Sequence, residues 1–146
     1  MPYHHAMKTT DALFQPQPDP ALVEAEMIAA AMACVEAFTD RFNARDLEGM
    51  DALLHFPHII LSAEQLVIWD GPGKLPDSFF EDLQRTTCWD ETRYQRKAAV
   101  LVSPRKVHLV LDYTRNRSDG SIASAHSNMW VVTYEKDRWG IKQRSY

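Results

Sequence analysis

The sequence lacks the features that mark several protein classes. It has only two cysteines, Cys34 and Cys88, without a CxxC spacing, so a disulfide scaffold is excluded and we expect reduced thiols. No apolar run approaches the ~20 residues that cross a bilayer, and the N-terminus lacks the pattern of a secretory signal. Sixteen basic residues against 20 acidic ones leave no basic stripe for nucleic acid. These absences predict a cytoplasmic protein that binds neither nucleic acid nor membrane.

What is present is the composition of one globular domain. The chain has 146 residues, of which 45% are hydrophobic and 25% charged, enough for one core and too few for two ordinary domains. Residues 1–18 include Gln15-Pro16-Gln17-Pro18, which disfavours helix and sheet because proline lacks an amide donor. We therefore expect a flexible N-terminal arm over 1–18 and a single domain over 19–146.

Three helices are expected in the first two thirds of the chain. Asp19-Pro20 is typical of a helix start, and apolar residues at spacings of three and four continue to about Asn43. Asp46 can cap a short second helix, and Pro76 stands near the start of a third that ends at about Thr87.

Alternating or β-branched runs predict six strands. Two short strands are expected over 56–62 and 65–69, and four longer ones over 93–102, 107–115, 122–135 and 139–144. A strand of about ten residues spans roughly 33 Å, so we expect such a sheet to bend. The predicted fold is α+β, with a curved, mostly antiparallel sheet wrapped around a long N-terminal helix and two shorter helices. Such a cone leaves room for a pocket at its wide end.

Four segments resemble the nuclear transport factor 2-like superfamily in its SnoaL-like branch. They are Phe38-Thr39-Asp40-Arg41-Phe42-Asn43-Ala44-Arg45-Asp46, His55-Phe56-Pro57-His58, Trp69-Asp70-Gly71, and the closing hairpin from Trp130 to Ile141. The resemblance runs from about residue 20 to the end. It implies a cone-shaped fold, a homodimer, and a pocket between the long helix and the inner sheet face.

The resemblance implies a small apolar or cyclic ligand and leaves the activity open. Members include isomerases, dehydratases and cyclases that move protons without a cofactor. However, the inward positions of the first helix are Phe38 and Phe42, where ketosteroid isomerase-like members carry a tyrosine, and phenylalanine cannot donate a hydrogen bond. The alternative is a non-catalytic dimeric interaction module whose cone is filled by its own side chains.

The strand over 122–135 carries the main candidate site. One face presents His126, Asn128, Trp130 and Tyr134 together, which suits an apolar pocket with a few orienting polar groups. We expect His126 to be the acid or base and Asn128 and Tyr134 to orient the substrate. The alternative is that this is the outer face, with His126 in solvent or at a dimer contact.

Other candidates lie on neighbouring elements. Asp112 shares a strand face with His108 and could serve as a second catalytic group, or belong to a polar convex face. The remaining predicted binding residues are Trp69, Phe38, Phe42 and His58. His55 and His58 are three residues apart, but Pro57 breaks any helix between them and no HExxH motif is present, so we predict no metal. No cofactor is expected.

Overall fold

The computed structural model describes residues 23–146 and confirms the α+β fold. The helices are α2 (Glu24–Asn43), α3 (Leu47–Asp51) and α4 (Phe79–Thr87). The strands are β1 (Leu54–Ser62), β2 (Gln65–Trp69), β3 (Glu91–Ser103), β4 (Lys106–Asn116), β5 (Ile122–Glu135) and β6 (Arg138–Ser145). The expected arm over 1–18 and the expected helix start at Asp19-Pro20 lie outside the described residues.

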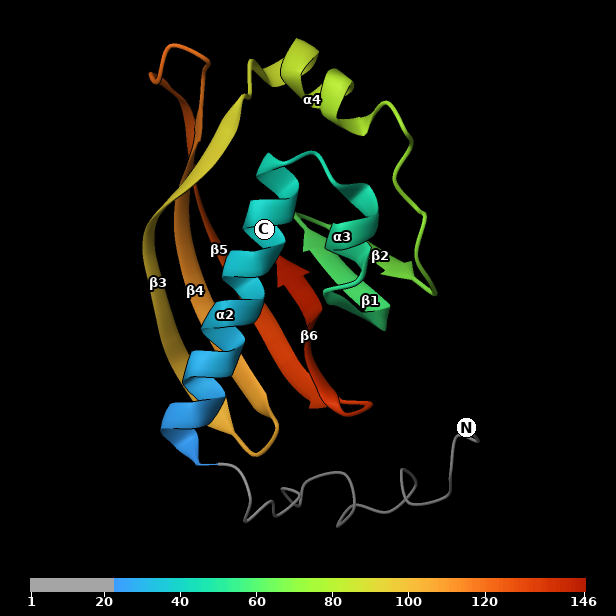
Figure 1. Cartoon of the computed structure of the whole chain (residues 1–146), viewed down its shortest axis with the longest axis vertical. Coiled ribbons are helices and arrows are strands. Elements are labelled where there is room, and N and C mark those ends of the chain that lie inside the picture. The colour runs from blue at the N-terminus through green and yellow to red at the C-terminus, as the bar shows by residue number, and fades with distance from the viewer. Residues whose placement is uncertain (1–22) are drawn as a thin grey trace.

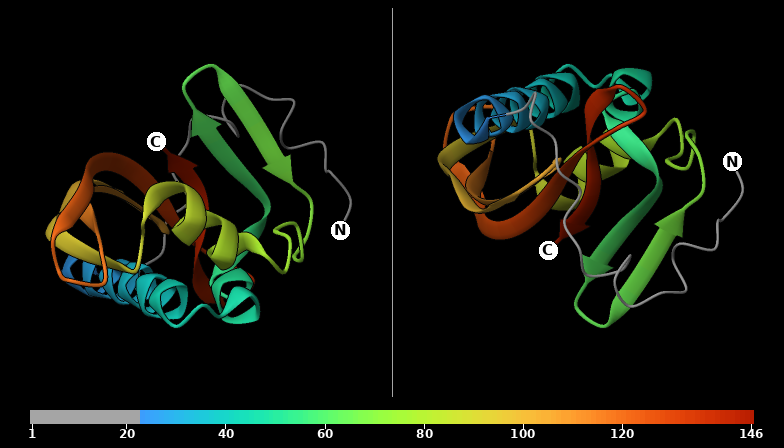
Figure 2. Two further views of the ribbon diagram at one scale, coloured as in Figure 1. Left: turned by 90° about the horizontal axis from the view of Figure 1, so that it is seen from above. Right: turned by 90° about the horizontal axis from the view of Figure 1, so that it is seen from below.

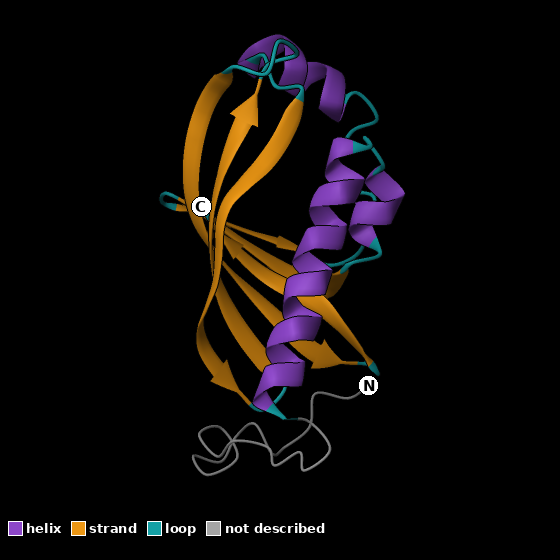
Figure 3. Cartoon of the chain, turned by 60° about the vertical axis from the view of Figure 1, so that its left-hand side comes forward, coloured by secondary structure: helices purple, strands orange, loops and turns teal. Residues whose placement is uncertain are grey.

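The strands form one curved sheet in the order β2-β1-β6-β5-β4-β3. Every neighbouring pair is antiparallel except β1 and β6, which run parallel. Helix α2 packs along the concave side of β3, β4, β5 and β6 (Figures 1 and 3). The sheet therefore wraps around a helix, as the strand lengths predicted.

The concave face contains the core. Val107, Leu109 and Leu111 of β4 and Val132 of β5 are fully buried, and they alternate with more exposed neighbours. From α2, Ala31 and Val35 are buried against this face. Because side chains alternate along a strand, the face of β5 that carries His126, Asn128 and Trp130 is the concave one.

A β-bulge in β6 changes which residues face inward. Val132 of β5 lies opposite Ile141, but the preceding residue, Val131, lies opposite Gln143. One extra residue of β6 is thus accommodated beside Val131, and the alternation shifts by one position. Ile141 and Arg144, three residues apart, are consequently both buried. The bulge turns the Arg144 side chain toward the interior.

Helix α4 and the segment after it cover one end of the cone (Figures 1 and 2). Trp89 follows this helix and is fully buried. Its ring packs edge-on against Phe42 of α2 at 5.1 Å and lies 5.5 Å from Phe80 of α4. Its indole nitrogen donates a hydrogen bond to the Thr92 hydroxyl at 2.9 Å. Trp89 therefore connects α4, α2 and the start of β3.

Both cysteines are free thiols, with Cys34 buried and Cys88 exposed. Burial raises the pKa of the Cys34 thiol to about 11, so this group is un-ionised at neutral pH. Within residues 23–146, no helix combines the length and the apolar character needed to span a bilayer.

Candidate functional site

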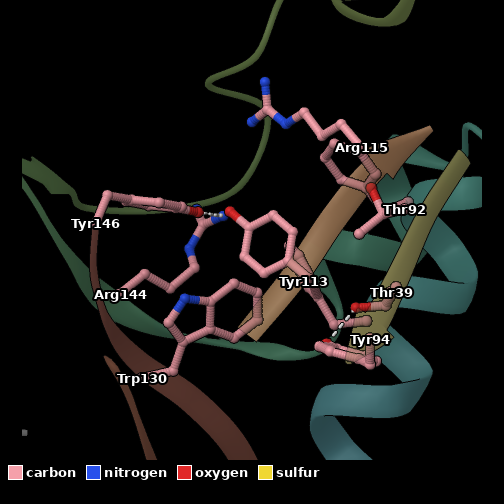
Figure 4. Close-up of a pocket in the computed structure, with 10 residues that line it drawn as sticks. Thr39, Thr92, Tyr94, Tyr113, Arg115, Trp130, Arg144 and Tyr146 are labelled. Carbon is pink, nitrogen blue, oxygen red and sulfur yellow. Dashed lines mark hydrogen bonds between the residues drawn. The ribbon is translucent and has the colours of Figure 1, made fainter. Parts of the chain in front are cut away.

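A pocket lies between α2 and the concave face of the sheet (Figure 4). Its volume is about 420 Å³ including the open mouth, of which about 50 Å³ is space for the centres of water-sized molecules. A single water needs only about 10–15 Å³ by the same measure. Ten residues line it: Phe38, Thr39, Phe42, Thr92, Tyr94, Tyr113, Arg115, Trp130, Arg144 and Tyr146.

Aromatic rings form most of the pocket wall. Phe38 of α2 and Trp130 of β5 meet edge to face, with ring centroids 5.4 Å apart. Tyr146 packs on the other side of Trp130 at 6.5 Å. Flat rings at these spacings offer faces on which a planar ligand can stack.

Hydroxyl groups supply polar atoms on the opposite side of the pocket. The hydroxyls of Thr39 and Tyr94 hydrogen-bond to each other (Figure 4), and the Tyr94 hydroxyl also donates to the Val35 carbonyl at 3.3 Å. Tyr113 accepts a hydrogen bond from the Asn128 amide at 2.7 Å. Burial is the main cause that raises the pKa of both tyrosines, so both stay protonated at neutral pH.

Arg144 is the charged group of this site. Only 6% of its surface is exposed. Its Nε donates to Nε2 of His58 at 3.0 Å, and its Nη1 donates to the Tyr146 hydroxyl at 3.0 Å. The guanidinium also lies 5.2 Å from the centre of the Phe38 ring and 5.5 Å from that of Trp69.

His58 has a defined protonation state. Because Nε2 accepts from Arg144, this nitrogen carries no proton, and Nδ1 donates to the Ile141 carbonyl at 3.0 Å. Burial, together with the nearby Arg144 charge, lowers the pKa of His58 to about 3. The imidazole is therefore neutral and holds the guanidinium in place.

The predicted site residues take different positions around this pocket. Phe38, Phe42 and Trp130 line it directly. His58 and Trp69 contact Arg144, and Asn128 contacts Tyr113.

His126 lies on the concave face beside the pocket but is not part of its lining. It is half-buried and stacks on Tyr113 with ring centroids 5.2 Å apart. Its Nε2 shares a hydrogen bond with the Ser124 hydroxyl at 2.8 Å. Burial first, and the Arg115 charge second, lower the pKa of His126.

Two predicted residues lie away from the pocket. Asp112 is on the convex face, where it accepts a hydrogen bond from Ser127 at 2.6 Å and lies 3.8 Å from Arg96. The alternation along β4 places it on the opposite face from its inward neighbour Tyr113, so Asp112 belongs to the polar convex face, which was the alternative that the sequence offered. Tyr134 packs against Trp139, near the turn between β5 and β6, away from the ligand-sized space.

The polar lining was largely missed by the sequence analysis. Tyr94 and Tyr113 sit at inward positions of predicted strands, so alternation could have identified them. Arg144 could not be identified in this way, because the bulge that turns it inward has no clear sequence signal. Among residues 23–146, no group of three or more histidine, cysteine, aspartate or glutamate side chains is arranged to hold a metal ion.

No protein-family model matches the sequence, and no curated protein matches it. Solved structures do match. A cystatin-like fold protein of unknown function from Nostoc punctiforme has a TM-score of 0.62 and 15% identity, over 85% of this chain and 91% of that one. A ketosteroid isomerase-like protein from Shewanella frigidimarina has a TM-score of 0.59 and 12% identity, over 82% and 95%.

An NTF-2 like protein of unknown function from Shewanella oneidensis has a TM-score of 0.55 and 12% identity, over 84% of this chain and 98% of that one. At such low identity these likenesses establish the fold. The chain thus has the NTF2-like, cystatin-like fold that the sequence resemblance predicted.

Proposed function

We propose that this protein binds a small planar organic molecule in the pocket between α2 and the concave sheet face. The observation that carries the proposal is the pocket itself, which combines an aromatic wall with a few converging polar groups. That combination is typical of small-molecule sites. A cone filled by its own side chains, the alternative from the sequence, would leave no such space.

We further propose that the protein catalyses proton transfer, as SnoaL-like enzymes do. The lowered pKa of His126 makes its imidazole neutral at pH 7 and able to accept a proton. The pocket lining itself, as far as residues 23–146 define it, contains no histidine, aspartate or glutamate. The lining therefore favours binding of a ligand. We propose His126, which lies beside the pocket, as the proton carrier if the protein is an isomerase, dehydratase or cyclase.

Filling the pocket should abolish binding without unfolding the protein. Thr39→Leu adds bulk from α2 into the cavity and uses a residue with high helix propensity. Isothermal titration with naphthalene-sized aromatic compounds should give at least a tenfold loss of affinity relative to wild type. Ala33→Leu adds similar bulk at an exposed position of the same helix and should leave affinity unchanged. Equal affinities for both variants, or no binding to wild type, would contradict the proposal.

We also propose a homodimer through the β1–β2 hairpin. This hairpin extends away from the body of the cone (Figure 2), and β2 is an edge strand. Leu61 pairs with Leu66, and Ile59 with Ile68, so these four apolar side chains share one face. Leu66 and Ile68 are 61% and 59% exposed, and an exposed apolar cluster of this kind is typical of a protein interface.

Charges placed on this face should separate the dimer. Light scattering after size exclusion should give a dimer for wild type and a monomer for Leu66→Lys and Ile68→Lys, because a buried lysine without a partner is costly. Ile122 is similarly exposed at 58% but lies on β5, so Ile122→Lys should remain dimeric. A monomeric wild type at 100 μM would show that the hairpin does not join two copies.

A further inference from the structure

Arg144 places a permanent positive charge inside an aromatic environment. The residue is only 6% exposed, and its guanidinium lies within 6 Å of the ring centres of Phe38, Trp69, Trp130 and Tyr146. Among residues 23–146, no carboxylate forms an ion pair with it: the partners of its hydrogen bonds are His58 and Tyr146. A buried charge without a counter-ion is unfavourable, so a ligand that supplies one is favoured.

The surroundings orient this charge without neutralising it. His58 holds the Arg144 Nε through a neutral ring nitrogen, and Tyr146 accepts from Nη1. Neither hydrogen-bond partner carries a negative charge. Nη2 forms no hydrogen bond with any residue of 23–146 and belongs to a side chain that lines the pocket, which leaves it for a ligand.

The rest of the pocket lining is also positively charged. Arg115 is a second cation in the lining, and no aspartate or glutamate of the described chain lines the cavity. The Trp130 side chain is 5% exposed, and its indole nitrogen is a buried donor without a partner. Buried donors normally find an acceptor. Arg144 and Trp130 both line the pocket, and each has a hydrogen-bond donor without an acceptor among residues 23–146.

We propose that the ligand is a small aromatic carboxylate, whose carboxylate pairs with Arg144 and accepts from Trp130 while its ring stacks within the aromatic wall. Guanidinium groups match carboxylates geometrically and form strong charge-assisted hydrogen bonds with them. This inference rests on the proposed pocket and specifies the chemical class that the pocket selects.

A pair of isosteric probes tests the charge requirement separately from the pocket. Benzoate and benzamide have nearly the same shape, and only benzoate carries a negative charge. Titration calorimetry at pH 7 should show benzoate binding roughly 10- to 100-fold more tightly to wild type, as expected for a hydrogen bond to a charged group. Equal affinities would overturn the carboxylate inference and leave the pocket proposal standing. If neither compound binds at millimolar concentration, both proposals fail.

Variants of Arg144 assign the effect to this residue. Arg144→Met removes the charge with similar bulk and should abolish the preference for benzoate over benzamide. Arg144→Lys keeps the charge without the planar fork and should retain the preference at roughly tenfold lower affinity. It also covers the case in which Arg144→Met does not fold. Arg96→Met, at an exposed arginine on β3, is the matched control and should bind like wild type. A preference that persists in Arg144→Met would overturn the assignment.

Nuclear magnetic resonance gives a second readout at the indole. The Trp130 Nε1 proton should shift downfield when benzoate is added, because it gains an acceptor. The corresponding proton of Trp139, which packs with Tyr134 near the β5–β6 turn, should not move. An unchanged Trp130 signal at saturation would remove this residue from the site.

Discussion

Trp89→Ala is expected to destabilise the protein by about 3–5 kcal/mol, the range measured for removing a large buried aromatic side chain. Trp89 is fully buried and packs against Phe42 and Phe80. The substitution also removes the hydrogen bond to the Thr92 hydroxyl. Because Phe42 and Thr92 line the pocket, we expect aromatic ligands to bind more weakly as well. Urea unfolding and ligand titration measure the two effects.

Trp139→Ala is the matched control for this experiment. Trp139 is partly buried and packs with Tyr134 near the β5–β6 turn. Its removal should cost less stability than that of Trp89 and should leave ligand affinity unchanged. A loss below about 1 kcal/mol for Trp89→Ala, with wild-type affinity, would show that α4 does not depend on this residue.

Acidification is expected to destabilise the protein through His58. The pKa of His58 falls from its usual value of 6.5 to about 3 in the folded state. Between these values the unfolded chain binds a proton at His58 that the folded protein does not, so stability falls as pH falls. The slope approaches 1.36 kcal/mol per pH unit, or about 2–3 kcal/mol between pH 6.5 and 4.5. Urea unfolding across this range measures the change.

Variants at two histidines separate the contribution of His58 to the pH dependence of stability from the contributions of other histidines, which have the same sign. Burial also lowers the pKa of His55, His108 and His126, so the wild-type slope contains several contributions. His58→Gln keeps an acceptor for Arg144 and should remove the largest part of the slope. His126→Gln, at a half-buried site, should remove less. A slope in His58→Gln equal to that of wild type would show that folding does not lower the pKa of His58.

Local patterns in the sequence predicted the elements and one wall of the site. The three- and four-residue spacing on α2 places Phe38 and Phe42 on its inner side, because a helix repeats every 3.6 residues. The alternation along β5 places Trp130 and Asn128 on one face, and the close turns between the last four strands favour an antiparallel meander. These features depend on neighbours along the chain, so the sequence contains them directly.

Long-range pairing determined the remaining features of the site. Residues 54–62 pair in parallel with residues near the end of the chain, and nothing in either segment specifies this partner. Strict alternation along β6 would place Arg144 and Ile141 on opposite faces of the sheet. The pocket would then lack its central charge.

The sequence by itself thus determined the helices, the strands and the aromatic side of the pocket, since each follows from local periodicity and residue type. Only the tertiary structure decided that Arg144 faces inward and that His58 holds it. The physical reason is the extra residue of β6 opposite Val131. It moves every later side chain of that strand to the opposite face of the sheet. The position of the extra residue is fixed by the pairing of β6 with its sequence neighbour β5 and with the distant strand β1.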